Sequence, residues 1–400
     1  MYRTLAGLLL TSVLSASLSA QTPDDPIEDA RFQTGPIGLS PAIALTGFGV
    51  DTNVFNDFDD PRRDLTFTVS PMLDTWLRAG RSRLHVFTRT DLMYFHQYAS
   101  ERSVDGVVDS RFEVRGNRVA PWITAAAASG RQRWGYEIDL RYRRITSDLG
   151  AGVGVRVGSR TRVGVNARYS TYNHEPDALY LGSNLRELLD RNTTALGGEF
   201  RYALTALTTW VVSGEQAHDR FVYTPARDAN SWRIDTGFDL APTALIAGRG
   251  RVGYRRFAGI GGDFPLYSGI VASVAATSRI RSRTQLEVTS ARDVDYSWEP
   301  TYPYYVVTGA MLTVTPQLTL RWDVRARLGA QRFAYRAAVW LPSSLPDRVD
   351  RVGMLGWGVG YRLAPDVRVG IDIDREHRRS AIRLREYQGF RTGLSVTYGR

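Results

Sequence analysis

The chain has 400 residues, a formal net charge of +10 at pH 7 and no cysteine, and its 51 basic residues are all arginine. Without cysteine, a disulfide framework, thiolate catalysis and a lipid anchor on cysteine are excluded. The arginines are dispersed along the sequence rather than clustered, so the basic balance does not indicate a nucleic-acid partner.

Residues 1–20 are typical of a secretory signal peptide. Arg3 provides the positive start, residues 5–14 form an apolar run, and residues 15–20 are rich in small side chains. The apolar run is too short for a membrane-spanning helix. Residues 21–38 are polar and acidic, and this composition predicts a flexible N-terminal segment in the periplasm.

From residue 39 onward, a tight turn followed by an alternating strand recurs every 35–49 residues. The predicted turns and strand starts are Ser40-Pro41, Gly80-Arg81, Ala120-Pro121, Gly158-Ser159, Leu204-Thr205, Ala241-Pro242, Ile280-Arg281, Thr315-Pro316 and Ala364-Pro365. Each repeat has room for two strands, one long loop and one short turn. The repeats therefore predict about 18 strands, with 16 or 20 possible.

Apolar and polar side chains alternate within the repeats. In residues 318–328, one side of the expected strand carries Leu320 and Trp322, and the other carries Arg321 and Asp323. The same alternation is found in residues 163–169, 232–240 and 367–374. Strands of about 9–11 residues with this pattern cross a bilayer when they are tilted.

A soluble β-sandwich or β-propeller is the alternative, and propeller blades also repeat at about 40–45 residues. Each blade needs four short strands, whereas each repeat of this chain holds two long ones. The sequence therefore predicts an all-β fold, a single transmembrane antiparallel up-and-down β-barrel over residues 39–400.

The polar faces of the strands predict a hydrated lumen. The side chains assigned to its lining are Arg168, Arg233, Asp235, Arg249, Arg251, Arg321, Asp323, Arg325, Arg327, Arg368, Asp372 and Asp374. Arginine outnumbers aspartate in this set, so a mild preference for anions is one expectation. The alternative is a wetted wall of compensating ion pairs without a dedicated anion site.

The long connections are expected outside the cell and the short turns in the periplasm. The long connections span residues 53–63, 98–106, 129–144, 173–191, 216–230, 258–266, 293–303, 335–349 and 376–388. Residues 184–189 could form one or two helical turns.

Aromatic residues near the expected strand ends predict two girdles at the lipid headgroups. One girdle would contain Tyr94, Tyr98, Tyr169, Tyr172, Tyr254, Phe257, Tyr302, Tyr304 and Tyr305, and the other Trp76 and Trp122. A second interpretation is that Tyr296, Trp298 and Tyr302 stack against sugar rings.

The sequence contains no complete catalytic or metal-binding motif. Its five histidines form no His-x-x-x-His pair, and no Gly-x-Ser-x-Gly elbow is found. The best acidic cluster is Asp372 and Asp374 followed by Glu376 and His377, and a solvated lumen wall is the simpler interpretation of it. We therefore expect no catalytic residue, no cofactor and no metal.

The first hairpin carries the resemblance to a known family. Residues 39–45 read Leu-Ser-Pro-Ala-Ile-Ala-Leu, residues 49–55 read Gly-Val-Asp-Thr-Asn-Val-Phe, and residues 64–71 read Asp-Leu-Thr-Phe-Thr-Val-Ser-Pro. This pattern, with the hairpin rhythm that follows, resembles the outer-membrane β-barrel porin type 2 family, which is often encoded with exopolysaccharide or capsule export genes. The resemblance implies an outer-membrane location and a role in polysaccharide export.

The expected function is a non-enzymatic, hydrated conduit for exopolysaccharide across the outer membrane of a Gram-negative-type bacterium. A general or anion-preferring porin for small solutes is the first alternative, and a barrel enzyme acting on lipid or polysaccharide is another. The expected partners are outer-membrane lipid, the outer-membrane assembly machinery, polysaccharide and periplasmic export proteins.

Overall fold

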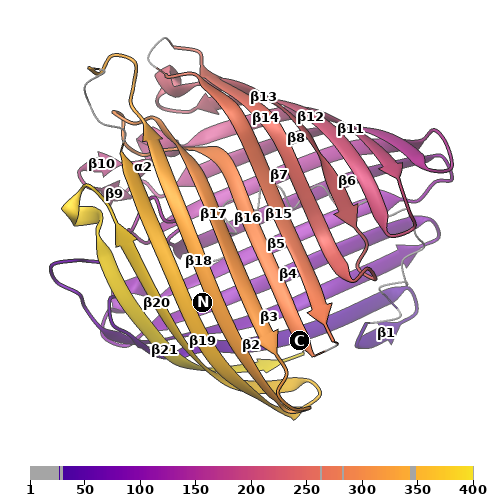
Figure 1. The fold of residues 1–400 in the computed structure, drawn as a ribbon, viewed down its shortest axis with the longest axis horizontal. Helices are drawn as coiled ribbons and strands as arrows, with labels where there is room; N and C mark the ends of the chain where they lie inside the picture. The colour runs from indigo at the N-terminus through magenta and orange to yellow at the C-terminus, as the bar shows by residue number, and fades with distance from the viewer. Residues whose placement is uncertain (1–26, 28–29, 262–263, 282, 343–347, 400) are drawn as a thin grey trace.

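The computed structural model describes residue 27 and residues 30–261, 264–281, 283–342 and 348–399. Nineteen strands form one antiparallel sheet, and β1 pairs only with β2. The remaining eighteen strands close into a barrel, as Figure 1 shows. The predicted all-β barrel and its strand number are confirmed.

The barrel strands are β2 (Ile37–Asp51), β3 (Asp64–Ala79), β4 (Ser82–Phe95), β5 (Ser103–Val114), β6 (Val119–Gln132), β7 (Tyr142–Arg156), β8 (Thr161–His174), β11 (Arg191–Ala203), β12 (Thr208–Phe221), β13 (Ala229–Leu240), β14 (Ile246–Gly259), β15 (Tyr267–Ile280), β16 (Thr284–Tyr296), β17 (Tyr304–Pro316), β18 (Trp322–Arg336), β19 (Val349–Ala364), β20 (Val367–Arg379) and β21 (Tyr387–Tyr398). The other elements are β1 (Phe32–Thr34), β9 (Leu179–Tyr180), β10 (Ser183–Asn184), α2 (Leu185–Leu189) and the 3₁₀ turns η1 (Ala99–Glu101), η2 (Pro225–Arg227) and η3 (Arg383–Arg385).

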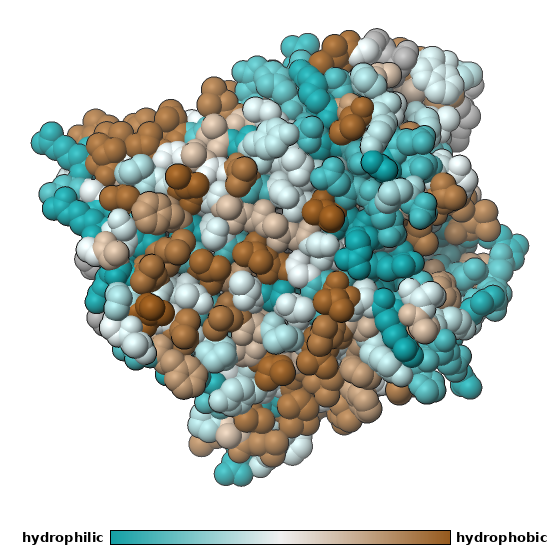
Figure 2. All heavy atoms as spheres, turned by 180° about the vertical axis from the view of Figure 1, so that it is seen from behind, coloured by the Kyte–Doolittle hydropathy of each residue, from teal (hydrophilic) through white to brown (hydrophobic). Residues whose placement is uncertain are grey.

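The first and last strands close the barrel. β2 pairs with β21 from Ile43 opposite Tyr398 to Asp51 opposite Arg391, with an irregularity between Leu45 and Phe48. Closure removes the free edges that a sheet would otherwise expose in lipid. Apolar side chains point outward along the strands, and Figure 2 shows them gathered over the strands on the face seen from behind. No helix among the described residues is long and apolar enough to cross a membrane.

Short turns and long loops alternate, so all the short turns lie at one end of the barrel. This end faces the periplasm by the general rule for bacterial barrels. The turn between β3 and β4 consists of Gly80 and Arg81, and Gly80 has the positive φ of 59° that such two-residue hairpins require. The short helix predicted in residues 184–189 is α2, which Asn184 caps by accepting a hydrogen bond from the backbone N–H of Arg186.

Three predicted turns are wrong by a few residues. Ser40 and Pro41 lie inside β2, which begins at Ile37, and Ala120 and Pro121 lie inside β6, which begins at Val119. The turn after β17 comes after Pro316 rather than at it. The strand expected over residues 318–328 begins only at Trp322, and Leu320 in the preceding turn is 93% exposed. Exposed apolar side chains in this turn continue the alternation of the sequence beyond the strand.

The predicted signal peptide, residues 1–20, lies outside the described residues, as do residues 21–26 of the predicted flexible segment. Within that segment, β1 pairs with β2 in a hairpin that places Phe32 opposite Leu39. The ordered chain therefore includes part of the segment that the sequence predicts to be flexible.

Candidate functional site in the barrel lumen

The loop between β6 and β7, residues 133–141, folds into the extracellular mouth of the barrel. Tyr136, Glu137 and Ile138 are buried although they lie in a loop, and Glu137 is only 5% exposed. The side chains that pack around Tyr136 come from β17, β18 and β19 and are Tyr305, Val307, Phe333, Tyr335 and Val352. An apolar core thus forms inside the mouth of the barrel.

β18 lies almost opposite this loop. Between β6 and β18 stand β5, β4, β3, β2, β21, β20 and β19 on one side of the barrel. Between β7 and β18 stand β8 and β11 to β17 on the other side. Because Tyr136 reaches the side chains of β18, residues 133–141 cross the lumen.

Arg378 at the end of β20 fixes the loop to the opposite wall. Its Nη1 donates to the backbone oxygen of Tyr136 and lies 3.0 Å from a carboxylate oxygen of Asp139. Its Nη2 lies 2.6 Å from Asp350 on β19. Arg378 and Asp350 are both fully buried, so the pair is shielded from solvent. Removing one partner of such a pair leaves an uncompensated buried charge.

Arg385 and Arg348 complete the charged cluster. Arg385 donates to the backbone oxygen of Glu137 and lies 3.6 Å from Asp350. Arg348 lies 3.0 Å from Asp350 and 2.6 Å from Glu299. One carboxylate, Asp350, therefore connects three arginines that come from three different parts of the extracellular end.

Burial also changes the acidity of the loop residues. It raises the pKa of Glu137 to about 7, although the neighbouring guanidinium of Arg385 acts in the opposite direction. The hydroxyl of Ser297 donates to Glu137 at 3.0 Å. Burial lowers the pKa of Arg227 to about 10, and Arg227 donates to the backbone oxygens of Ser297 and Pro303. Glu137 therefore changes charge near neutral pH.

The hairpin tip of β16 and β17 fills a second part of the mouth. β15 and β16 pair only up to Ala272 and Arg292, although both strands continue beyond this point. Above it, Tyr296 packs edge-on against Phe221 and Phe257, and its hydroxyl donates to Asp219 at 2.8 Å. The hairpin tip thus leaves the wall and packs among side chains on the inner face of β12 and β14.

The lumen wall below the mouth is lined with ion pairs. Arg233 lies 2.6 Å from Asp235 and 3.5 Å from Asp293. Asp239 lies between Arg201 and Arg251, at 2.5 Å from Arg251. Arg255 also lies 2.7 Å from Asp293, and Glu199 lies 3.5 Å from Arg201, so each cluster holds two positive and two negative side chains and their charges compensate.

A second group of ion pairs connects β18 to β20. Arg327 lies 3.2 Å from Asp372 and 2.8 Å from Asp374, and Arg368 lies 2.6 Å from Asp323. These side chains pass over the intervening strand β19, which has three glycines on the same face.

The three glycines, Gly356, Gly358 and Gly360, leave the space that these ion pairs occupy. A Cβ at Gly358 would lie 2.3 Å from Oδ1 of Asp372, and one at Gly360 would lie 2.0 Å from Nη2 of Arg368. A side chain at either position would therefore displace the charged end of Asp372 or Arg368. The alternation of glycine in residues 356–360 is therefore the sequence signal for this cluster, and sequence reasoning missed it.

The twelve side chains predicted to line the lumen are brought together in part. Nine of them take part in the ion pairs Arg168–Glu215, Arg233–Asp235, Arg251–Asp239, Arg327–Asp372, Arg327–Asp374 and Arg368–Asp323. Arg249 lies opposite Asp239 in the sheet register, and Arg325 lies between Asp323 and Arg327 on β18. Arg321 differs, because it lies in the turn before β18 and donates to the hydroxyl of Tyr361.

The acidic cluster at the end of β20 does not assemble a metal site. Asp372 and Asp374 contact Arg327, and Glu376 accepts a hydrogen bond from the hydroxyl of Tyr387 at 2.5 Å. His377 lies on the opposite side of the strand, because its position differs by an odd number of residues. Across the described ranges, no group of three His, Asp or Glu side chains is placed to hold a metal ion.

The two aromatic girdles are only partly present. Tyr169 and Tyr254 face outward and are exposed, as predicted. The aromatic residues that instead pack inside the mouth are Phe257, Tyr304 and Tyr305. Trp76 stacks on His85, and Arg111 lies over the ring of Trp122.

Tyr296 and Trp298, which were considered for sugar stacking, are buried in the same apolar cluster as Phe257. Sequence position near a strand end could not distinguish a girdle from a core, because both need aromatic residues there.

The family model described as "Putative beta-barrel porin 2" matches residues 25–400. The chain belongs to this family. It is an outer-membrane, porin-like β-barrel, and its predicted location in a Gram-negative outer membrane is confirmed. No curated protein matches the sequence.

Three solved outer-membrane proteins are similar to this chain, and the first of them shows the same kind of fold. A BenF-like porin from Pseudomonas fluorescens Pf-5 has a TM-score of 0.50 and 9% identity, over 90% of this chain and 98% of that chain. The outer membrane protein opdK from Pseudomonas aeruginosa has a TM-score of 0.48 and 9% identity, over 90% of this chain and 98% of opdK. The copper transporter OprC has a TM-score of 0.46 and 10% identity. The match covers 91% of this chain but only 65% of OprC.

Proposed function

We propose that this porin-like barrel is a non-enzymatic conduit for hydrophilic, weakly charged solutes, and that its substrate is a polysaccharide leaving the cell. The observation that carries the proposal is the compensated inner wall, where Arg233, Arg251, Arg327 and Arg368 each contact a carboxylate. Paired charges create little net field, so they do not strongly select for ions.

The same side chains suit carbohydrate. Guanidinium groups donate several hydrogen bonds and carboxylates accept them, so the wall can exchange hydrogen bonds with sugar hydroxyls along the lumen. Because each arginine is held by a carboxylate, the wall presents these groups in a fixed arrangement. The first-hairpin resemblance to a family associated with polysaccharide export genes supports the same substrate.

A porin for small solutes is the second candidate. It is favoured by residues 133–141, which cross the mouth and leave less room for a polymer than an open barrel would. Polysaccharide export requires this loop to move, whereas passage of small solutes does not. The two candidates therefore differ in whether the mouth must open.

Planar-bilayer recording tests the conduit and its wall. In a salt gradient, the wild-type channel should show a reversal potential close to zero, because the wall is compensated. A strongly ion-selective channel would contradict the proposal. The substitution Arg327→Gln leaves Asp372 and Asp374 without their arginine. The reversal potential of this variant should therefore shift toward cation selectivity.

The substrate is tested in the producing bacterium. Deletion of the gene should abolish surface polysaccharide, and the wild-type gene supplied in trans should restore it. If surface polysaccharide is unchanged while uptake of small hydrophilic solutes falls, the small-solute porin is correct.

A further inference from the structure

Four arginines form one row across neighbouring strands near the extracellular end. In the sheet register, Arg292 on β16 lies opposite Thr308 on β17, and Thr308 lies opposite Arg332 on β18. Arg332 lies opposite Arg351 on β19, and Arg351 lies opposite Arg379 on β20. Only Thr308 interrupts the row of positive charge.

The row lies on the outward face of the barrel. Arg332 shares its side of β18 with Leu328, and Arg351 shares its side of β19 with Leu355 and Trp357. Leu328, Leu355 and Trp357 are exposed apolar side chains of the kind that face lipid. Arg332, Arg351 and Arg379 are themselves exposed. The row therefore lies where the strands leave the apolar band, at the level of the outer lipid headgroups.

Like charges directly opposite each other destabilise a sheet. On the inner wall, arginines are accompanied by carboxylates, as at Arg327 and Arg368. None of the described carboxylates forms an ion pair with Arg332, Arg351 or Arg379. The described residues thus do not neutralise these three charges, whereas carboxylates neutralise Arg327 and Arg368 in the lumen.

A notch in the barrel wall adjoins the row. Above Ala272 and Arg292 the ladder between β15 and β16 ends, and the backbone oxygen of Ile270 would lack a strand partner. Arg292 donates to that oxygen from Nε at 3.2 Å and to Thr308 from Nη1 at 2.8 Å. The hydroxyl of Tyr267 also donates to the oxygen of Ile270, at 3.0 Å.

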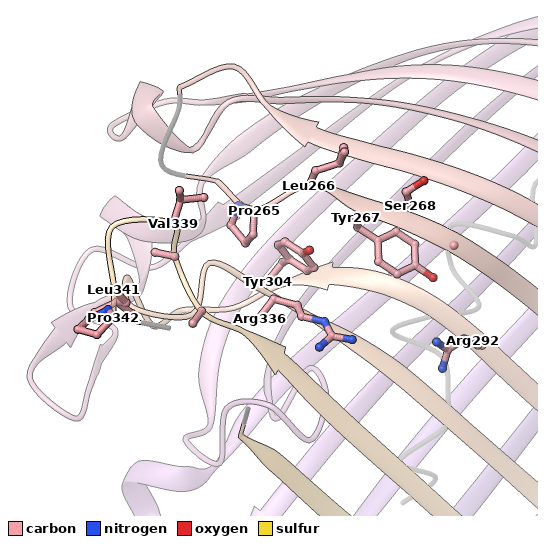
Figure 3. A pocket seen from close by; sticks show the side chains of 13 residues that line it. Pro265, Leu266, Tyr267, Ser268, Arg292, Tyr304, Arg336, Val339, Leu341 and Pro342 are labelled. Atoms are coloured by element: carbon pink, nitrogen blue, oxygen red, sulfur yellow. The ribbon is translucent and has the colours of Figure 1, made fainter. Parts of the chain in front are cut away.

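The notch has a cavity of about 580 Å³. Figure 3 shows the guanidinium groups of Arg292 and Arg336 facing the same space as the ring of Tyr267. Leu266 and Val339 also line the cavity and are exposed, and two arginines are among its described lining residues. The notch therefore combines positive charge with apolar surface.

A similar but smaller gap shows that the chain can close such a break by itself. β5 and β6 pair only up to Gly106 and Ser129. There the carboxylate of Asp105 accepts a hydrogen bond from the backbone N–H of Arg131 at 2.9 Å. At the β15–β16 break the acidic side chain next to Arg292 is Asp293, which instead pairs with Arg233 and Arg255 on the inner wall, and a cavity remains.

We propose that the arginine row and the adjoining notch bind a phosphorylated lipid of the outer leaflet. The phosphate groups contact Arg332, Arg351 and Arg379, and an acyl chain occupies the notch beside Leu266 and Val339. Guanidinium groups bind phosphate through paired, charge-assisted hydrogen bonds, so the lipid supplies the missing negative charge. A free anion in solution would explain the row but not the apolar notch next to it.

Thermal unfolding of the full-length barrel in zwitterionic micelles, with and without bisphosphorylated lipid A, tests this inference. Without lipid A, Arg351→Gln should unfold at the same or a higher temperature than wild type, because it removes the central repelling charge. With lipid A, wild type should be stabilised and Arg351→Gln should bind it roughly tenfold more weakly. The sign of the substitution's effect thus reverses with lipid A.

Arg256→Gln is the matched control. Arg256 is exposed on the outward face of β14, and its register neighbours are Trp232 and Ser268 rather than arginines. The control should respond to lipid A as wild type does, and Arg379→Gln should respond as Arg351→Gln does.

Three results would overturn the inference. The first is that lipid A stabilises wild type and Arg351→Gln equally. The second is that dephosphorylated lipid A stabilises wild type as much as bisphosphorylated lipid A does. The third is that inorganic phosphate alone shifts the unfolding temperature of wild type as much as lipid A does. The last result would assign the row to a free anion rather than to a lipid.

Discussion

The extracellular mouth and the wall below it hold charge in different ways. In the mouth, Asp350 is fully buried and connects arginines that come from separate segments. On the wall, Arg327 and Asp374 lie on β18 and β20 and stay partly open to the lumen. The comparison shows that the long loops provide a buried core at one end, whereas the strands alone provide only a hydrated lining.

Shortening the loop that crosses the lumen should have the largest effect. Replacing residues 134–140 with a short Gly-Ser linker removes Tyr136 and Glu137 from the mouth. Single-channel conductance in planar bilayers should increase several-fold. A Gly-Ser insertion in the turn at residues 204–207 is the control and should leave conductance unchanged. Unchanged conductance in the loop variant would mean that the loop does not narrow the path.

Asp350→Asn should destabilise the mouth strongly. The substitution leaves Arg378 and Arg385 buried with less negative charge, which costs about 3–5 kcal/mol in comparable buried pairs. The midpoint of thermal unfolding in micelles should fall clearly. The matched change Asp366→Asn affects an exposed pair with Arg31 and should cost at most about 1 kcal/mol. Similar losses for the two variants would contradict the special role of burial in the mouth.

The mouth should respond to pH through Glu137. The pKa of Glu137 in the folded mouth is about 7, whereas an ordinary glutamate has a pKa of 4.5. Between these two pH values, Glu137 holds a proton in the folded mouth and releases it when the mouth opens. Protonation of Glu137 therefore favours the closed mouth. The closed mouth loses at most about 3 kcal/mol of stability as pH rises from about 4.5 to about 7.

The groups that face Glu137 are Arg385, Arg378, Ser297 and Asp295. Conductance should accordingly be lower at pH 5 than at pH 8, and Glu137→Gln should remove this part of the dependence. A dependence that persists in Glu137→Gln would assign it to another group.

Gly358→Ala should have the smallest effect and test the wall alone. The new Cβ would lie 2.3 Å from Asp372, so the contacts of Arg327 must shift, at a cost of about 1–3 kcal/mol. Gly106→Ala on β5 is the control, because no atom lies within 4 Å of its Cβ position. The prediction fails if both variants unfold at the same temperature.

Much of the architecture follows from local pattern. Alternation in residues 232–240 and 367–374 predicts one inner and one outer face for each strand, since a strand has a strict period of two. The pattern failed at Leu320, because an exposed apolar residue in a turn looks the same as one on a strand. The glycines of residues 356–360 carried a signal for the β18–β20 ion pairs, but it was not recognised.

The sequence by itself determined the barrel and its strand number, because these depend on residues close together in the chain. Only the tertiary structure decided that residues 133–141 cross the lumen and that Glu137 is buried beside Arg385. It also decided that Arg332, Arg351 and Arg379 form one row. Contacts between distant strands depend on sheet register and loop closure, and neither can be obtained from a local pattern.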